Sequence, residues 1–474
     1  MIPLTLAEVA AATGGTLTDG AYPDTVVRGS VEFDSRKVEP GGLFIALAGE
    51  RVDGHDYVPA ALAAGAVAAL ASRPVGAPAV VVDDVLVALG RLAREVADRL
   101  PELTVVGLTG SAGKTSTKDL VAQVLRRLGP TVAPPGSFNN ELGHPWTVLR
   151  ADRSTRYLVL EKSARGLGHI RWLTEVAPPR IGVVLNVGVA HVGEFGSMEI
   201  TAQAKGELVE ALPAAADGGV AVLNADDPRV RAMADRTAAR VVLVGTAPDA
   251  EVRAEAVQLD GAGRPSFRLV SPAGTVPVEL GLYGGHHVGN ALAAAAVGLH
   301  LGMPLDQVAD ALCAARPVSR RRMEVVERDD GVTVVDDTYN ANPDSVRAAL
   351  DALKAIATGG VARRRAWAVL GHMGELGAQS AAEHESIGRR AVRLGIDRLV
   401  VIGPDAAPMH AGAVAAGSGG EESVHVPDVD AAVDLLAAQL RPGDVVLVKA
   451  SKSAHLERVT AALLGRGPGE EGAE

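Results

Sequence analysis

The sequence predicts an α/β protein of three domains, in which helices cover sheets of mainly parallel strands. The chain has 474 residues, and at about 100–200 residues per domain this length predicts about three domains. Hydrophobic residues make up 47% of the chain but aromatic residues only 3%, a composition typical of short aliphatic strands buried under helices. Strand-like apolar runs alternate with helix-like segments over most of the chain, which is the rhythm of βαβ units.

Residues 1–102 are expected to form a small mixed α/β domain, which Pro101 closes. The Ala-rich stretch Ala60–Ala71 is expected to lie in a packed helix. The other expected elements are the strands Val26–Val31, Leu43–Ala48 and Ala79–Val82 and the helices Val58–Ala64 and Leu86–Arg99.

Residues 103–316 are expected to form a central domain around a parallel sheet that helices cover on both faces. The domain begins with the apolar run Thr104–Thr109 and ends near Arg316-Pro317. Its further expected elements are the strands Tyr157–Leu160, Ile181–Asn186, Val220–Asn224 and Val241–Val244 and the helix Asn290–His300.

Residues 317–474 are expected to form a C-terminal doubly wound, Rossmann-like domain. The expected strands are Val332–Val335, Trp367–Leu370, Leu399–Ile402 and Val445–Val448, and the expected helices are Ser345–Ile356, Glu383–Leu394 and Val429–Leu440.

Charge and cysteine content exclude several classes of protein. The net charge of −11 argues against a nucleic-acid partner, which would need a basic face. The single cysteine, Cys313, excludes an intrachain disulfide framework and a cysteine-based zinc cluster. The N-terminus lacks the pattern of a signal peptide, and the longest apolar stretches are shorter than the roughly 20 residues of a membrane span. We expect a cytoplasmic monomer without membrane insertion.

The stretch Thr109-Gly-Ser-Ala-Gly-Lys-Thr-Ser-Thr117 has the chemistry of a phosphate cradle. It lies between an expected strand and an expected helix, where Gly110 and Gly113 allow a tight turn and backbone N–H groups can approach an anion. Lys114 would reach the β- and γ-phosphates of ATP, and the Thr115 hydroxyl would be a ligand of Mg²⁺. The central domain is therefore predicted to be P-loop ATPase-like.

The cradle departs from the full G-x-x-x-x-G-K-[ST] pattern, because Leu108 stands at the position of the first glycine. A shortened cradle argues against a GTPase, a kinase or a motor ATPase. A chance Gly-Lys-Thr at a helix start is the alternative, and the flanking strand and helix argue against it.

Two residues at strand ends are candidate metal ligands. Glu161 ends the expected strand Tyr157-Leu-Val-Leu-Glu161, and His191 follows the strand Ile181–Asn186. The carboxyl ends of parallel strands form the edge where open α/β sheets bind ligands, so both would lie near the cradle. Each taken alone is more often structural. Lys205, in Ala202-Gln-Ala-Lys-Gly-Glu207, is by composition and spacing an ordinary helical lysine.

Motifs along nearly the whole chain resemble the Mur ligase family, whose members are ATP-dependent, amide-forming enzymes of peptidoglycan precursor synthesis. The short cradle T-G-x-x-G-K-T-[ST] is that family's version. The other matching stretches are Asp34–Phe44, Asp53–Asp56, Asn139–Pro145, Asn186–Ser197, Ala204–Glu207, Asn224–Pro228, His287–Ala294, Asp336–Pro343, Gly371–Gly377 and Val448–Lys452.

The resemblance implies the substrates. The runs Tyr339–Pro343 and Gly371–Gly377 are those of the members that use a tripeptide and a dipeptide, and the Asp-Asn-Pro-Arg signature of the diaminopimelate-adding members is not found. The resemblance thus implies ligation of D-alanyl-D-alanine to UDP-N-acetylmuramoyl-tripeptide through an acyl phosphate, with release of ADP and phosphate. The implied first domain binds the UDP-sugar-peptide, and the C-terminal domain binds the dipeptide and closes on ATP.

The resemblance also implies residue roles. The expected catalytic residues are Lys114, Glu161, His191 and Lys205. Residues Gly110, Ser111, Ala112, Gly113, Lys114, Thr115 and Ser116 would hold the ATP phosphates. Asn290 would contact the adenine side, Arg322 matches the family's linker arginine and would also bind the nucleotide, and Asp337 matches the ribose-binding aspartate. Two Mg²⁺ ions are implied, with Thr115, Glu161, His191 and a carbamylated Lys205 as ligands. Substrate contacts are implied for Ser35, Arg36, Asn139, Asn140, Tyr339, Asn340 and Asn342.

One departure from the family pattern follows Glu161. The family usually has an apolar residue and then glycine, whereas this chain has Lys162 and Ser163. Adjacent strand residues face opposite sides, so Lys162 is not required to point at the metal.

Three alternatives stay open at this point. One is another amide ligase of the superfamily, either a folylpolyglutamate synthetase or a ligase that adds a single amino acid. The second is a module that binds ATP without forming a bond, against which the combination of Glu161, His191 and Lys205 argues. A kinase is the third and is disfavoured by the shortened cradle.

Overall fold

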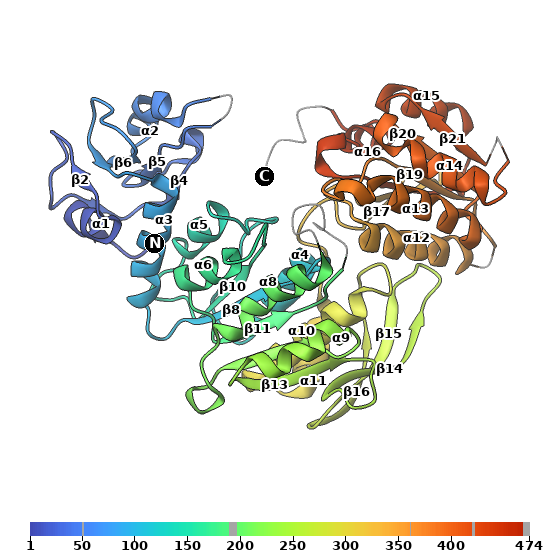
Figure 1. Cartoon of the computed structure of the whole chain (residues 1–474), viewed down its shortest axis with the longest axis horizontal. Coiled ribbons are helices and arrows are strands. Elements are labelled where there is room, and N and C mark those ends of the chain that lie inside the picture. Colours follow the sequence, from blue (N-terminus) through green and yellow to red (C-terminus); the bar gives the residue numbers. More distant parts are fainter. Residues whose placement is uncertain (50–51, 189–196, 361, 420–421, 468–474) are drawn as a thin grey trace.

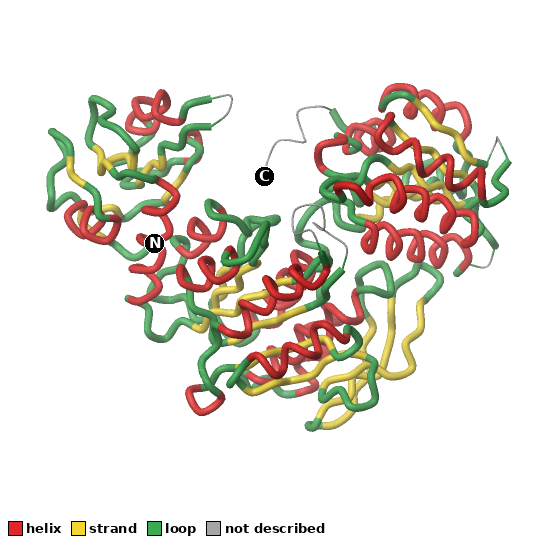
Figure 2. Tube along the Cα trace, in the orientation of Figure 1, coloured by secondary structure: helices red, strands yellow, loops and turns green. Residues whose placement is uncertain are grey.

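The computed structural model describes residues 1–49, 52–188, 197–360, 362–419 and 422–467. Three lobes follow one another along the chain, with the first and third on either side of the second (Figure 1). Each lobe combines a sheet with helices (Figure 2), which confirms the α/β fold class that the sequence predicts. Among the described residues, no helix has the length and apolar character needed to cross a bilayer.

The first lobe contains a five-stranded sheet of order β2-β7-β6-β5-β4 and a two-stranded ribbon of β1 and β3. Strands β4 to β7 are parallel, and β2 is antiparallel at one edge. The elements are β1 (Leu4–Thr5), α1 (Leu6–Thr13), β2 (Thr16–Leu17), β3 (Val26–Val27), β4 (Val31–Glu32), β5 (Leu43–Ile45), α2 (Val58–Ala63), β6 (Ala68–Ala71), β7 (Ala79–Val81) and α3 (Val85–Asp98).

Two local predictions for this lobe are wrong. The expected strand Val26–Val31 is two short strands, β3 and β4, which belong to different sheets. The expected helix in Ala60–Ala71 ends at Ala63, and Ala68–Ala71 is the buried strand β6. Gly65 separates them at φ +114, and an added Cβ there would come 2.8 Å from Pro40 Cα, so the chain turns where a helix could not continue.

Helix α3 joins the first lobe to the second. Its apolar face shares one core with Val105, Leu158 and Leu160 of the central sheet. Beside it, Trp146 Nε1 donates a hydrogen bond of 2.9 Å to the Val31 carbonyl. The two lobes therefore meet through a continuous apolar core as well as through the covalent connection.

The second lobe is built on a nine-stranded sheet of order β16-β15-β14-β13-β12-β11-β8-β10-β9. Strands β8 to β14 pair in parallel, and β14, β15 and β16 form an antiparallel extension that the sequence analysis did not predict. The elements are β8 (Thr104–Thr109), α4 (Lys114–Leu125), β9 (Thr131–Val132), α5 (Gly143–Val148), β10 (Tyr157–Glu161), α6 (His169–Val176), β11 (Ile181–Val184), α8 (Met198–Glu210), β12 (Val220–Asn224), α9 (Pro228–Arg231), β13 (Arg240–Gly245), β14 (Val252–Leu259), β15 (Pro265–Ser271), β16 (Gly274–Glu279), α10 (His287–His300) and α11 (Leu305–Ala314).

The strand order places a ligand-binding edge beside β8. From β8 the chain goes to the outer strand β9 and back to β10 on one side, then crosses to β11, β12 and β13 on the other. Open α/β sheets bind ligands at such a switch point, outside the carboxyl ends of the strands. The cradle follows β8 and Glu161 ends β10, so both lie at this edge.

The third lobe has a six-stranded sheet of order β17-β18-β22-β19-β20-β21, parallel except for the edge strand β17. The loops after β18, β22 and β19 therefore emerge side by side. The elements are β17 (Glu324–Glu327), β18 (Thr333–Asp336), α12 (Pro343–Thr358), β19 (Ala366–Leu370), α13 (Ser380–Leu394), β20 (Arg398–Ile402), α14 (Ala407–Ala415), β21 (Ser423–Val426), α15 (Val429–Gln439), β22 (Val445–Lys449) and α16 (Glu457–Leu464).

The linker into the third lobe is fastened to helix α4, the helix that begins at the cradle. Gln123 exchanges two hydrogen bonds with the backbone of Arg316, of 3.0 and 3.1 Å. Three residues later, Ser319 N donates to the Asp119 carboxylate at 3.1 Å. The position of the third lobe is thus tied to the helix that would carry the bound phosphates.

Candidate functional site

The cradle is a tight turn from β8 into α4. Gly113 precedes the helix at φ +81, and an added Cβ there would come 2.8 Å from Asn290 Oδ1 of α10. Glycine is thus required both for the left-handed backbone and for the approach of Asn290. The Asn186 side chain accepts a hydrogen bond from Ala112 N at 2.8 Å and donates one to Ala112 O at 3.1 Å, which fixes the shape of the loop.

Lys114 stands at the first turn of α4, with its ammonium folded over the cradle. Its Nζ donates a hydrogen bond of 2.8 Å to the Gly110 carbonyl. Desolvation lowers the pKa of Lys114, and the nearby Glu161 carboxylate opposes that shift. A lysine beside the backbone N–H groups of a helix N-terminus forms a binding place for an anion.

Glu161 is buried at the end of β10 and accepts three side-chain hydrogen bonds. The donors are Thr115 Oγ1 at 2.8 Å, Ser137 Oγ at 3.0 Å and Asn139 Nδ2 at 2.6 Å. The 2.8 Å between Thr115 Oγ1 and Glu161 Oε2 matches the roughly 2.9 Å expected between neighbouring ligand oxygens around an octahedral Mg²⁺ with bonds of about 2.0–2.1 Å. These two oxygens fit a magnesium ion that also binds substrate phosphates.

The two other expected metal ligands are His191 and Lys205. His191 lies outside the described residues. Among the residues that are described, no three histidine, cysteine, aspartate or glutamate side chains gather closely enough to hold a metal ion. A cation between Thr115 and Glu161 would therefore need oxygens from the substrate as well, which is the usual situation for Mg²⁺ at nucleotide sites.

Lys205 is buried in helix α8, with only 2% of its surface exposed. Burial lowers the pKa of Lys205 well below its usual value, and the positive charge of Lys114 lowers it further. The low pKa favours the neutral amine. A neutral amine is the form of lysine that can add to carbon dioxide, whereas an ammonium has no lone pair to do so.

Lys162 points away from Glu161, to the opposite face of β10. Its Nζ lies 2.7 Å from His144 Nε2 of α5 and donates to the Leu173 carbonyl of α6 at 2.9 Å. Gly107 gives it room, because a Cβ there would come 2.8 Å from Lys162 Cε. Burial lowers the pKa of Lys162 well below its usual value. The departure from the family pattern therefore puts no cation beside Glu161.

The Lys162→Met variant tests this state of the amine through stability. The lowered pKa favours a neutral Lys162 in the folded protein, whereas the unfolded chain holds it protonated. The unfolded state then binds more protons, and wild-type stability is expected to rise with pH. Below the ordinary lysine pKa of about 10.4, this contributes up to about 1.4 kcal/mol per pH unit. We expect the difference in unfolding free energy, wild type minus variant, to grow by that slope in urea titrations from pH 7 to 9.

A matched control is Lys354→Met, which removes a partly exposed lysine of α12 and is expected to leave the pH slope of the wild type unchanged. Identical slopes for wild type and Lys162→Met would mean that Lys162 is charged in the folded protein.

A cavity of about 670 Å³ joins the cradle to the third lobe. The second lobe contributes the cradle, the Glu161 carboxylate and the start of α10. The third lobe contributes the linker, residues after β18 and Lys449 at the end of β22. Its lining includes the residues Ser111, Ala112, Gly113, Lys114, Thr115, Ser116, Asn139, Glu161, Asn290, Arg322, Asp337, Tyr339, Asn340, Asn342 and Lys449.

On the third-lobe wall, Arg322 stacks on Tyr339. The guanidinium carbon lies 4.0 Å from the ring centroid, which is the geometry of a cation–π contact. Asp337 lies beside them, where its Oδ2 is 2.6 Å from Lys449 Nζ and its Oδ1 accepts from Met323 N at 3.2 Å. The linker arginine and the carboxylate thus belong to one ordered surface facing the cradle.

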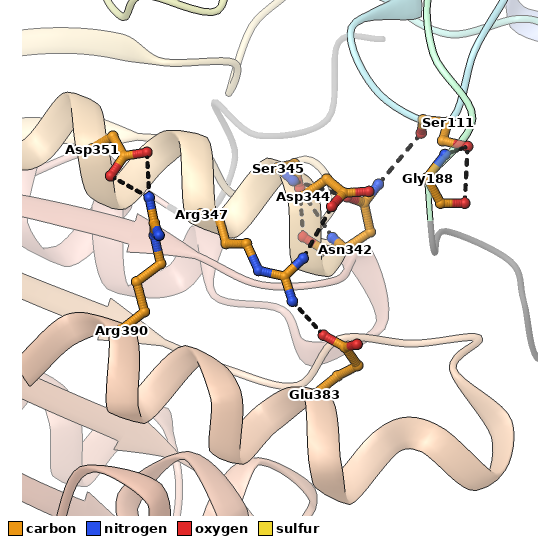
Figure 3. Close-up of polar contacts among 9 residues, drawn as sticks. All are labelled: Ser111, Gly188, Asn342, Asp344, Ser345, Arg347, Asp351, Glu383 and Arg390. Carbon is orange, nitrogen blue, oxygen red and sulfur yellow. Dashed lines mark hydrogen bonds and ion pairs between the residues drawn. The ribbon is translucent and has the colours of Figure 1, made fainter. Parts of the chain in front are cut away.

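The start of α12 touches the cradle directly (Figure 3). Asn342 caps α12 by accepting from Ser345 N at 2.9 Å, and its Nδ2 lies 3.4 Å from the Ser111 carbonyl. Asp344, paired with Arg347 at 3.0 Å, lies so close to Gly188 that a Cβ there would overlap its carboxylate. The third lobe is therefore already docked onto the phosphate loop.

Three segments of the chain match models of known protein domains. Residues 29–97 match the Mur ligase family catalytic domain, residues 108–298 the Mur ligase middle domain and residues 321–452 the Mur ligase glutamate ligase domain. A curated relative from Mycobacterium tuberculosis, UDP-N-acetylmuramoyl-tripeptide--D-alanyl-D-alanine ligase, is 54% identical over 98% of both chains. The chain belongs to the Mur ligase family.

Further relatives agree with this membership. The Escherichia coli protein of the same name is 36% identical, over 98% of this Mur ligase and 100% of that protein. Among solved structures, MurF from Acinetobacter baumannii has a TM-score of 0.87 at 30% identity, covering 98% and 99% of the two chains. MurF ligase from Thermotoga maritima in complex with ADP has a TM-score of 0.78 at 30% identity, covering 92% and 97%.

Several expected site residues of this Mur ligase lie apart from the cavity lining. Ser35 and Arg36 lie in the first lobe, where the Arg36 side chain is 86% exposed and pairs with Asp34 at 2.8 Å. Asn140 accepts from Gly143 N at 2.9 Å at the start of α5. Lys205 and Gly110 are not among the residues that line the cavity.

The structure adds residues to which sequence reasoning gave no role. Ser137, Asn186, Asp227, His287 and Lys449 all line the cavity. Their signal in the sequence is weak, because each lies in a loop or at an element end whose partner is distant along the chain. The available cues were positional: Asn186 ends an expected strand, Lys449 follows one, and Asp227 and His287 lie in stretches that match the family.

Proposed function

We propose that this Mur ligase joins D-alanyl-D-alanine to UDP-N-acetylmuramoyl-tripeptide, using ATP and releasing ADP and phosphate. The observation that carries the proposal is the single cavity in which the cradle and Glu161 face Tyr339, Asn340 and Asn342. A phosphate-binding loop opposite a polar wall on a separate lobe suits a reaction between a phosphorylated carboxylate and a second substrate. Relatives at 54% and 36% identity bear the name of this activity.

The nucleotide would bind across the two lobes. Backbone N–H groups of residues 110–116 and the Lys114 ammonium would hold the phosphates, because a helix N-terminus favours negative charge. Asn290, beside Gly113, would contact the adenine side, and Asp337 would bind the ribose. Arg322, the linker arginine, would also contact the nucleotide. Mg²⁺ would be held by Thr115 and Glu161, with His191 as a further ligand, and would neutralise charge on the phosphates.

Lys205 would serve as a metal ligand after carbamylation. Its amine, when neutral, would add to carbon dioxide, form an N–C bond and release a proton, which would leave a negatively charged carbamate in place of the amine. Oxygen ligands are what Mg²⁺ prefers, so the modified side chain suits a second Mg²⁺.

The reaction has two stages. The terminal carboxylate of the tripeptide attacks the γ-phosphorus of ATP, and ADP leaves from an acyl phosphate. The amine of the dipeptide then attacks the acyl carbon, loses a proton, and phosphate leaves as the amide forms. Lys114 stabilises charge on the transferred group, and the lobes hold the reactants in place and exclude water.

The substrates would occupy different lobes. Residues 1–102 would bind the UDP-sugar-peptide through Ser35 and Arg36, with Asn139 and Asn140 beside its peptide end. Residues 317–474 would bind the dipeptide through Tyr339, Asn340 and Asn342, and residues 103–316 would bind ATP. We further propose that the protein is a cytoplasmic monomer.

The test is release of ADP and phosphate from ATP with UDP-N-acetylmuramoyl-tripeptide and a panel of acceptors. The panel holds D-alanyl-D-alanine, L-alanyl-L-alanine, single amino acids and glutamate with a folate. We expect D-alanyl-D-alanine alone to stimulate release, with amide product seen by mass spectrometry. Stimulation by single amino acids or by glutamate with folate would indicate another amide ligase, and nucleotide binding without product a non-catalytic module.

A further inference from the structure

Lys449 is a buried lysine at the third-lobe wall of the cavity. It ends β22, which lies between β18 and β19 in the sheet, so its side chain emerges beside the loop that carries Asp337. Only 3% of its surface is exposed, yet it lines the cavity. A buried ammonium is costly unless it is paired and hydrogen-bonded, so its partners indicate what it does.

Lys449 Nζ binds two groups that face the cavity. It lies 2.6 Å from Asp337 Oδ2 and donates a hydrogen bond of 2.8 Å to the Asn340 carbonyl. The other oxygen of Asp337 accepts from Met323 N in the linker. One ammonium therefore connects a carboxylate, the loop after β18 and, through that carboxylate, the linker between the lobes.

The segment after Lys449 fastens the same loop a second time. Ser451 Oγ donates to the Ala341 carbonyl at 3.2 Å and accepts from Gly374 N at 2.7 Å. Two successive carbonyls, of Asn340 and Ala341, are thus held from the end of β22. The loop conformation depends on these contacts across strands that are far apart along the chain.

We infer that Lys449 is a positioning residue, which holds Asp337 and the Asn340 loop in one fixed arrangement so that the nucleotide ribose and the dipeptide meet groups already in place. The inference rests on the proposed function, which assigns the ribose to Asp337. The compact ammonium of lysine can pair with a carboxylate and donate to a carbonyl on different elements at once. The planar guanidinium of arginine holds its N–H groups in a fixed fork and would not reproduce these two contacts. Removal of Lys449 leaves a largely buried carboxylate unpaired and its loop unfastened.

The experiment measures ADP and 2′,3′-dideoxy-ADP binding by calorimetry, with Mg²⁺ present, in wild type, Lys449→Met and the control Lys354→Met. The ratio of the two affinities reports contact with the ribose hydroxyls. Hydrogen bonds to a charged group predict a ratio of about 10 or more in wild type and in Lys354→Met. We expect the ratio to fall to about 1–2 in Lys449→Met, with the KM for D-alanyl-D-alanine raised as well.

A ratio in Lys449→Met equal to that of wild type would overturn the inference, as would a wild-type ratio of 1. If Lys449→Met fails to fold, Lys449→Arg is used instead, since it keeps the charge. Its ratio of ADP to dideoxy-ADP affinity is expected to fall in the same way. In an Asp337→Asn background, Lys449→Met should change the ratio no further, because Lys449 acts through Asp337. The proposed ligase activity is tested separately, and an absence of dipeptide-stimulated phosphate release in the wild type would contradict it.

Discussion

Replacing Lys114 with methionine is expected to lower the rate of ATP- and dipeptide-dependent phosphate release on the order of 1000-fold. Methionine keeps the length of the side chain and removes the charge. The ammonium lies over the cradle with a hydrogen bond to the Gly110 carbonyl, where it can turn to an incoming phosphate without any change of fold. Negative charge develops on the transferred phosphoryl group, so the loss concerns the transition state more than the folded protein.

The measurement is phosphate release under saturating substrates, together with ADP binding and a thermal melt. We expect the melting temperature of Lys114→Met to stay within a few degrees of wild type, since no core contact is removed. Lys354 does not line the cavity, so Lys354→Met is expected to keep full activity. More than a tenth of wild-type activity in Lys114→Met would remove this lysine from the proposed phosphate site.

The cradle and Glu161 could be predicted to lie together because both follow parallel strands. Parallel pairing aligns carboxyl ends, and in the structure Glu161 of β10 pairs in register with Leu108 of β8. What the sequence could not predict is the set of groups that hold Glu161. Ser137 and Asn139 come from a loop with no periodic pattern, and their hydrogen bonds to the carboxylate are a property of the folded chain.

The wrong predictions in the first lobe have a physical cause. Alanine favours helices in isolation, but Ala68–Ala71 is buried between two strands, where tertiary packing outweighs that preference. The segment Val26–Val31 contains Gly29, which packs so tightly that a Cβ would come 2.8 Å from the Pro40 carbonyl oxygen. A single pattern in the sequence therefore became two strands in two sheets.

Asn342 shows why residue roles are harder to predict than residue locations. The motif placed it near the dipeptide, and it does line the cavity. Its side chain also caps α12 and reaches the Ser111 carbonyl of the cradle. One amide thus contributes to helix stability and to contact between lobes, and a motif alone cannot separate these roles from substrate binding.

Lys205→Ala is expected to lose at least about 100-fold in activity and to recover part of it on addition of formate, acetate or propionate. Alanine removes the amine that would carry the carboxylate and leaves a space in which a small carboxylic acid can stand. The rescue distinguishes a missing oxygen ligand from a damaged fold, because a cavity in the core is not repaired by an added anion. An acid-independent loss of activity would contradict the carbamate.

A direct measurement is the ¹³C signal of a lysine carbamate after incubation with labelled bicarbonate. Burial lowers the pKa of both Lys162 and Lys205 well below the usual value, which favours the neutral amine. Lys162 is fully buried, and its Nζ lies 2.7 Å from His144 Nε2 and 2.9 Å from the Leu173 carbonyl oxygen, so adding a carboxyl group there would disrupt both contacts. We therefore expect the signal to persist in Lys162→Met and to vanish in Lys205→Ala. The opposite pattern would place the carbamate on the far face of β10, away from Glu161, where it could not serve as a ligand of the proposed metal.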